Sequence, residues 1–211
     1  MRVLFVGNSY TLYHDVPAQV AALTGLEVEA SVEGGADWKR HREVLGTPDR
    51  IARGFDVVVL QAKSTDPLLA RHAFFRHGGA LAGLARRSGA KVLLYQTWAW
   101  AADHRVYRDP WSKRSPEGWS RAVREAYARL ALATDAEVAP VGDAWLRALA
   151  AHPGLDLHAE DRHHAAFVGA HLAALVLARA LTRRDPRTFS YSPAELEAAV
   201  VVGLREIAAT T

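Results

Sequence analysis

The chain has 211 residues, half of them hydrophobic, and a formal net charge of +3, so we expect a folded chain with a substantial core rather than a disordered one. Its arginines are spread along the predicted helices instead of forming one basic run, which argues against nucleic acid as a partner. The absence of cysteine excludes disulfides and thiol catalysis. We predict a single domain spanning residues 1–211.

No segment predicts a targeting signal or a membrane anchor. The opening MRVLFVG is too short an apolar run for a signal peptide and has no small-residue cleavage site after it. The most apolar predicted helix, near 165–181, contains His171 and Arg179, so it does not predict a membrane span. We therefore expect a cytoplasmic protein with no membrane partner, and leave its oligomeric state open.

Strand-like and helix-like segments alternate along the chain. Strands are predicted from apolar or alternating runs at 2–7, 26–32, 55–61, 90–98 and 136–141. Helices are predicted from apolar residues at helical spacing at 12–24, 67–88, 117–134, 141–150, 164–182 and 193–209, with Ser192 as the N-cap of the last. This alternation predicts an α/β fold, with a parallel sheet of about five strands between layers of helices.

Two predicted connections, 99–116 and 151–163, are longer than simple turns, and such loops are usually functional or mobile. In open parallel sheets, ligands bind at the carboxyl ends of the strands. Several chemically useful residues directly follow a predicted strand and should meet at that rim. They are Ser9, Gly34, Gly35, Gln61 and Trp98.

A serine stands just after the first predicted strand, in VLFVGNSYT. A serine hydroxyl needs a base within hydrogen-bonding reach, and a carboxylate behind that base, to act as a nucleophile. Asp161 and His164 stand three residues apart before the last long predicted helix, a spacing that allows the carboxylate to reach the imidazole. Alternatively, Ser9 is only the N-cap of the first helix.

Five segments, in order along the chain, resemble the SGNH (GDSL-type) hydrolases. They are GNSYT, GGADWKRH, VVLQAKS, QTWAW and DRHHAAFVGAHLAA, at 7–11, 34–41, 58–64, 96–100 and 161–174. The first and last are the most specific, and they resemble a bacterial subgroup that begins with GNS[FY]T and carries D-x-x-H near its C-terminal end. The resemblance covers nearly the whole chain. It implies a flavodoxin-like three-layer α/β/α fold and serine esterase chemistry that needs no metal and no cofactor.

Carried over residue by residue, the resemblance implies that Ser9 is the nucleophile, His164 the general base and Asp161 the carboxylate that orients the base. The neighbouring His163 does not fit the D-x-x-H spacing and is interpreted as a surface or supporting residue. The substrate is then a small-molecule ester, with an acetyl group on a carbohydrate or a similar alcohol as the expected example.

The resemblance also implies donors for an oxyanion hole. The backbone N–H groups of Ser9 and of Gly34 or Gly35 would contribute, because such donors stabilise the charge of a tetrahedral intermediate. Alternatively, Gly34 and Gly35 form only a flexible turn. A side-chain amide normally adds a third donor, and Gln61 is our choice for it. The G-x-N-D of the family's third block is absent here, which leaves Ser64 as the other candidate.

Further residues near this rim are candidates for substrate binding. They are Asn8, His41, Lys63, Ser64 and Trp98. Lys63 replaces a glutamine expected in the subgroup, and it either holds an oxyanion or an acidic substrate or points into water. His41 either lines the pocket or is a buried structural imidazole. The tryptophans around 99–116 form either a platform for a sugar or acyl group or a packed patch beneath the loop.

Three other interpretations are weighed against the esterase. The fold could serve as a non-catalytic module that binds a small ligand at the same rim. A phosphate binder using 7–11 is disfavoured because no G-x-x-x-x-G-K-[ST] is present. A metal site is disfavoured because the family needs no metal; its candidate ligands are Asp156, His158, Asp161, His163 and His164.

Overall fold

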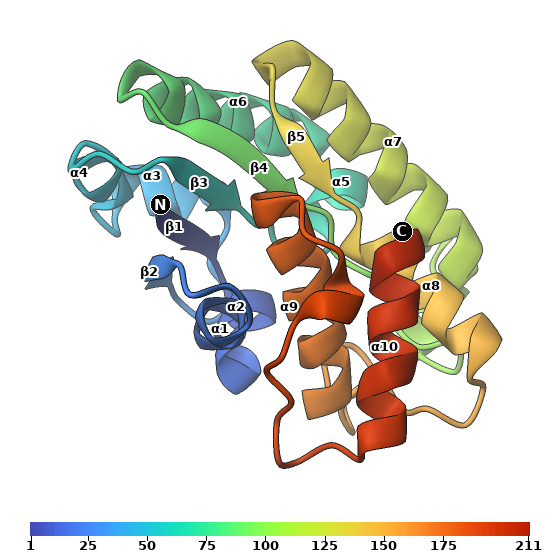
Figure 1. Cartoon of the computed structure of the whole chain (residues 1–211). Coiled ribbons are helices and arrows are strands. Elements are labelled where there is room, and N and C mark those ends of the chain that lie inside the picture. The colour runs from blue at the N-terminus through green and yellow to red at the C-terminus, as the bar shows by residue number, and fades with distance from the viewer.

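The predicted strands pair into one all-parallel sheet, seen at the centre of Figure 1. The computed structural model describes all residues, 1–211, and the strand order is β2-β1-β3-β4-β5. The strands are β1 (Arg2–Gly7), β2 (Glu27–Val32), β3 (Val57–Leu60), β4 (Lys91–Tyr95) and β5 (Glu137–Ala139). The predicted α/β class is therefore confirmed, and its sheet has five strands.

Helices cover both faces of the sheet, which gives three layers (Figure 1). Alternate strand residues point to opposite faces. Val3 and Phe5 belong to one buried cluster, with helices at 16–24, 141–151, 167–182 and 198–210, and Leu4 and Val6 belong to a second, with helices at 38–43, 47–51, 71–87 and 116–134. The longer helices are α2 (Val16–Thr24), α6 (Arg71–Arg87), α7 (Pro116–Thr134), α8 (Val141–Ala151), α9 (Phe167–Thr182) and α10 (Ala198–Thr210). The shorter ones are α1 (Ser9–Leu12), α3 (Trp38–Glu43), α4 (Thr47–Ile51) and α5 (Asp66–Leu69).

The first predicted helix is broken in the structure. Where the pattern predicts one helix over 12–24, α1 is followed by the 3₁₀ turn η1 (Tyr13–Asp15) and then by α2. His14 and Asp15 have φ angles of 57° and 47°, which no α-helix contains. The Asp15 side chain accepts the Ala18 N–H and so caps the second helix.

Other predicted boundaries also shift. The helix predicted over 67–88 divides at Ala70, whose backbone is not helical, and α9 begins at Phe167 rather than at 164. The N-cap prediction for Ser192 is wrong. The N-cap of α10 is Glu197, and the helix begins at Ala198 rather than at 193. The short helices α3 and α4 lie in a region for which the sequence predicted no element.

The long connection 99–116 is ordered by two 3₁₀ turns, η2 (Arg105–Arg108) and η3 (Pro110–Ser112). Trp100 and Trp111 from this connection lie against the fully buried Trp119 of α7. None of the helices combines the length and the apolar character that a bilayer-crossing segment requires.

Candidate active site

Ser9 lies where the chain leaves the end of β1 and enters α1. The Asn8 side chain accepts the Tyr10 N–H at 3.2 Å, and the Asn8 carbonyl accepts the N–H groups of Thr11 and Leu12, both at 2.9 Å. The first N–H groups of a helix have no intrahelical acceptor, so within this first turn only the Ser9 N–H is left without an acceptor. That N–H is available to a ligand beside the Ser9 hydroxyl.

Buried side chains hold residues 7–11, which we call the Ser9 turn, in place. Gln61 Oε1 accepts the Asn8 N–H at 2.8 Å and the Thr11 hydroxyl at 2.9 Å. A Cβ at Gly7 would lie 2.5 Å from both Gln61 Oε1 and Thr11 Oγ1, so this close approach requires glycine. The turn is therefore held both by its own residues and by Gln61, which directly follows β3.

Two predicted site residues, Gln61 and His41, hold the Ser9 turn in place and do not face a ligand. The Gln61 side chain is buried, and its amide nitrogen donates to the Ala62 carbonyl, so it is not directed at a reacting ester as a third oxyanion donor. His41 is fully buried, with Nε2 2.9 Å from the Gly7 carbonyl and Nδ1 3.0 Å from Thr47 Oγ1. His41 therefore does not line the pocket, and burial lowers the pKa of its imidazole despite the hydrogen bond to Gly7.

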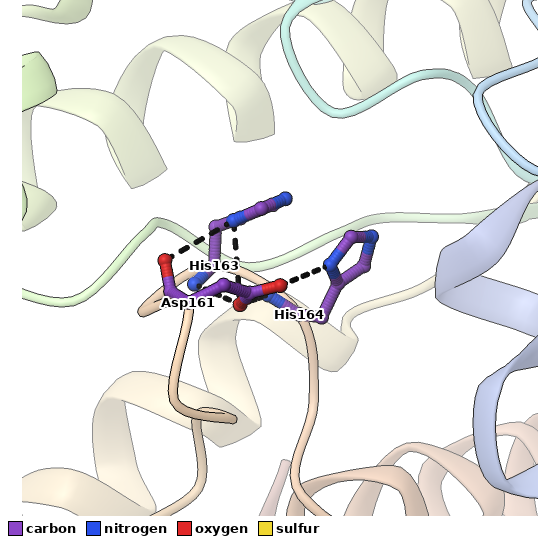
Figure 2. A group of neighbouring side chains, drawn as sticks. All are labelled: Asp161, His163 and His164. Atoms are coloured by element: carbon purple, nitrogen blue, oxygen red, sulfur yellow. Dashed lines mark hydrogen bonds and ion pairs between the residues drawn. The ribbon is translucent and has the colours of Figure 1, made fainter.

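Asp161 and His164 lie on the segment 156–166, which we call the base loop (Figure 2). His164 Nδ1 is 2.6 Å from Asp161 Oδ2, while Asp161 Oδ1 accepts the backbone N–H groups of His163 and His164 at 3.1 and 2.9 Å. Burial alone would raise the pKa of the Asp161 carboxyl, but these hydrogen bonds from His164 and His163 outweigh it and hold the pKa well below its usual range. Asp161 is thus an ionised acceptor that orients the ring.

The base loop and the Ser9 turn meet through one hydrogen bond. His164 Nε2 lies 2.8 Å from Ser9 Oγ, so Ser9, His164 and Asp161 form a continuous chain from hydroxyl to imidazole to carboxylate. Tyr13 and Tyr10 pack against the His164 ring, with centroids 4.6 and 5.4 Å away. The imidazole is therefore held on two sides as well as by its hydrogen bonds.

Contacts with the segment after β4 fix the position of the base loop. The Trp98 indole donates to the His163 carbonyl at 3.0 Å, and the Ala101 N–H donates to the Arg162 carbonyl at 2.9 Å. Arg162 also pairs with Asp103 at 3.0 Å. Trp98 is itself fully buried and stacks on Tyr10. It therefore supports the site from the core and does not line a surface that a substrate could contact, although the sequence predicted such a contact.

The remaining predicted site residues are either exposed or buried: Gly34, Gly35 and Lys63 are exposed, whereas Asn8 and Ser64 are buried. Gly34 and Gly35 form a turn after β2, and their N–H groups donate to no acceptor in the protein. The Asn8 amide donates to the Ala36 carbonyl at 2.9 Å, which ties the glycine turn to the Ser9 turn.

The five candidate metal ligands do not form one group. His158 is buried and lies 3.0 Å from the Ala99 carbonyl, and Asp156 pairs with Arg162. Only Asp161, His163 and His164 bring their ligand atoms together, all within 4.8 Å of one another.

A groove of about 490 Å³ opens beside the site, between α5 and the 99–116 connection. Its walls include Trp100, Trp111 and His104, with Arg105 and Arg108 on its edge. The Trp100 indole donates to the Tyr10 hydroxyl at 2.9 Å, so one wall of the groove is hydrogen-bonded to the residue that follows Ser9.

Sequence reasoning missed Tyr13 and His14. Tyr13 packs on the His164 imidazole although Tyr13 is 46% exposed, and His14 Nε2 lies 3.2 Å from the Ala165 carbonyl. Both lie at the break between α1 and α2, where His14 and Asp15 have positive φ angles. His and Asp adopt such angles more often than most residues, which was the one weak signal in the sequence.

No protein-family model and no curated protein sequence matches the chain. The chain is similar to several proteins of known structure. A protein of Slackia heliotrinireducens described as a candidate SGNH hydrolase is 31% identical, over 86% of this chain and 98% of that one, with a TM-score of 0.74. A DUF4886 family protein of Bacteroides uniformis has a TM-score of 0.82 at 18% identity, over 100% of this chain and 93% of that one.

The acetyl xylan esterase AlAXEase has a TM-score of 0.67 at 17% identity, over 86% of this chain and 100% of that one. At 17–18% identity, likeness to these two structures bears on the fold alone. The 31% identity to the Slackia protein, over 98% of its length, is high enough to bear on family membership as well as on fold. It shows that this chain belongs to the SGNH hydrolases, a superfamily of ester-hydrolysing enzymes.

Proposed function

We propose that this protein is a serine esterase in which Ser9 is the nucleophile, His164 the general base and Asp161 the carboxylate that orients and stabilises the base. The observation that carries the proposal is the pair of hydrogen bonds at His164, with Nε2 2.8 Å from Ser9 Oγ and Nδ1 2.6 Å from Asp161 Oδ2. An ionised Asp161 favours the tautomer with a proton on Nδ1, which leaves the Nε2 lone pair free to accept the Ser9 proton.

The reaction then proceeds in two halves. Ser9 Oγ attacks the ester carbonyl while its proton passes to His164 Nε2, and that proton leaves with the alcohol oxygen as the C–O bond breaks. A water molecule, deprotonated by His164, attacks the acyl-enzyme and releases the acid and the serine. The Ser9 N–H and an N–H of the Gly34–Gly35 turn are the proposed oxyanion donors, each contributing about 3–4 kcal/mol to the transition state.

For the substrate, we propose a small acyl group such as acetyl on a carbohydrate or a similar alcohol. The groove offers the Trp100 and Trp111 rings as walls, and Trp100 is hydrogen-bonded to Tyr10, the neighbour of Ser9. Aromatic walls with a few polar groups are typical of small-molecule sites. The fold is shared with AlAXEase, whose name describes it as an acetyl xylan esterase. The alcohol part would lie in the groove and the acyl carbonyl at Ser9.

The nucleophile is tested by intact-mass spectrometry after incubation with a fluorophosphonate. One adduct on wild type, lost in Ser9→Ala and in His164→Ala, is expected if His164 activates Ser9. Full esterase activity in pure Ser9→Ala would contradict the mechanism. No adduct on folded wild type would instead favour the non-catalytic binding module.

The substrate class is tested separately with nitrophenyl esters and acetylated xylo-oligosaccharides. We expect kcat/KM to be highest for the acetyl ester, and Trp111→Ala to raise KM for the oligosaccharide but not for nitrophenyl acetate. A preference for octanoyl over acetyl esters would contradict the small-acyl proposal while leaving the nucleophile unaffected.

A further inference from the structure

One side chain beside the proposed triad has no part in its chemistry. The His163 ring stacks on His164 with centroids 4.0 Å apart, and its Nδ1 lies 3.3 Å from Asp161 Oδ1 and 3.2 Å from the Asp161 carbonyl oxygen. Figure 2 shows both imidazoles projecting from the same loop, with their Nδ1 atoms facing the Asp161 carboxylate. His163 therefore adds a third potential ligand within 4.8 Å of the ligand atoms of Asp161 and His164.

The spacing of these atoms suits a small divalent ion. Zinc binds imidazole nitrogen and carboxylate oxygen at about 2.0–2.2 Å, so tetrahedral ligands stand roughly 3.3–3.5 Å apart. The two His163 and Asp161 atoms are already 3.3 Å apart. The His164 and Asp161 atoms, at 2.6 Å, need to separate by less than about 1 Å to reach that spacing.

The cluster is also open to solvent. The Asp161 side chain is 43% exposed and that of His163 27%, which leaves a path for the ion and room for water as its fourth ligand. The nearest guanidinium of the loop, Arg162, is held by Asp103 and Asp156, so two carboxylates offset its charge.

We propose that Asp161, His163 and His164 form an inhibitory zinc site that reversibly switches the hydrolase off. Zinc on Nδ1 of His164 obliges that ring to carry its proton on Nε2, which then donates toward Ser9 Oγ and cannot accept the serine proton. Two imidazoles and one carboxylate favour Zn²⁺ over Mg²⁺ or Ca²⁺, which prefer oxygen ligands. The inhibitory effect rests on the proposed function, whereas the binding of zinc does not.

Binding is tested by calorimetric titration of Zn²⁺ into metal-free wild type, His163→Ala, His163→Phe and His72→Ala. His163→Phe keeps an aromatic ring against His164 but has no ligand nitrogen. His72→Ala removes an exposed histidine of α6 and is the matched control. We expect wild type and His72→Ala to bind one ion at micromolar concentration, and both His163 variants to bind at least tenfold more weakly. Equal affinity in all four proteins would overturn the site.

The switch is tested by fluorophosphonate labelling and ester hydrolysis with and without zinc. We expect zinc to suppress both in wild type, EDTA to restore them, and the inhibitory concentration to rise at least tenfold in the His163 variants, whose zinc-free rates stay near wild type. Zinc that binds through His163 but leaves labelling unchanged would overturn the switch. Wild type that fails to label without zinc would overturn the proposed function instead, and calorimetry would still decide the metal site.

Discussion

The two halves of the proposed active site are stabilised in different ways. The Ser9 turn is buried, and its hydrogen bonds reach Gln61 and His41, which are distant in sequence. The base loop is partly exposed, and its central hydrogen bonds join Asp161 to residues only two and three positions away. A change in the Ser9 turn should therefore lower stability and activity together, whereas a change of the Asp161 side chain should affect chemistry more than folding.

The largest test of this contrast is Asp161→Asn. Asparagine can still accept the two backbone N–H groups, but it lacks the charge that orients and stabilises the His164 imidazole. We expect kcat for an activated ester to fall by about 10²–10⁴. The melting temperature should fall only slightly, because the Asp161 side chain is 43% exposed and solvent screens the stabilisation that its lowered pKa represents. A melting temperature that falls as steeply as the rate would show that the base loop is structural after all.

The second test concerns His171, on the helix that follows the base loop. Burial and the nearby Arg205 lower the pKa of His171 to about 4, whereas an unfolded histidine has a pKa of about 6.5. The folded state disfavours the protonated form, so the contribution of neutral His171 is complete above pH 6.5 and is lost as the pH falls toward 4. We expect the free energy of unfolding to decrease by up to about 3 kcal/mol over that range from this group.

Urea unfolding at several pH values checks this, with His171→Gln as the comparison because it removes the titrating group. The stability difference between wild type and variant should change between pH 6.5 and 4. A difference that stays constant with pH would contradict the assignment.

The third test is Gly7→Ala in the Ser9 turn. The added Cβ would meet Gln61 Oε1 and Thr11 Oγ1 at 2.5 Å, and such overpacking typically costs about 1–3 kcal/mol. We expect a lower melting temperature together with lower kcat, since the nucleophile moves with the turn. Gly34→Ala is the matched control, because a Cβ there has nothing within 4 Å. Equal melting temperatures for the two variants would show that the turn is less tightly held than its contacts indicate.

The smallest test adds stability on the base-loop side. Ala166 is the N-cap residue of α9 and offers no side-chain acceptor to the helix. Ala166→Ser supplies a capping hydroxyl, which is typically worth about 1 kcal/mol and should raise the melting temperature by about 2–4 °C in a chain of this size. Thermal unfolding and kcat measured on the same sample check that stability rises while the rate stays constant.

The sequence predicted the parts of the site that depend on local pattern. Buried strands show as continuous apolar runs, and the three-residue spacing of Asp161 and His164 corresponds to a turn in which both groups meet. The first helix was harder, because the spacing of apolar residues does not encode the positive φ angles of His14 and Asp15, which occur together with a tertiary contact between His14 and Ala165.

Residues whose role depends on burial could not be assigned from the sequence. A polar residue after a strand is equally compatible with an oxyanion donor and with an internal support, and only the fold shows that Gln61 is 1% exposed and committed to Asn8 and Thr11. The short helix α3, with the sequence WKRHRE, has too few apolar residues for a helical pattern. The buried faces of Trp38 and His41 become apparent only once the helix is packed.

The hydrogen bond between Ser9 and His164 spans 155 positions of the chain, which has a consequence for how the protein matures. During synthesis the proposed nucleophile emerges early and the proposed base late, so the two cannot meet until the segment that leads into α9 has docked. Contacts between distant segments form slowly because a long stretch of chain must first be ordered. In refolding from urea, reactivity toward a fluorophosphonate should therefore lag behind the recovery of helical circular dichroism, and the enzyme would report on the completion of its own folding.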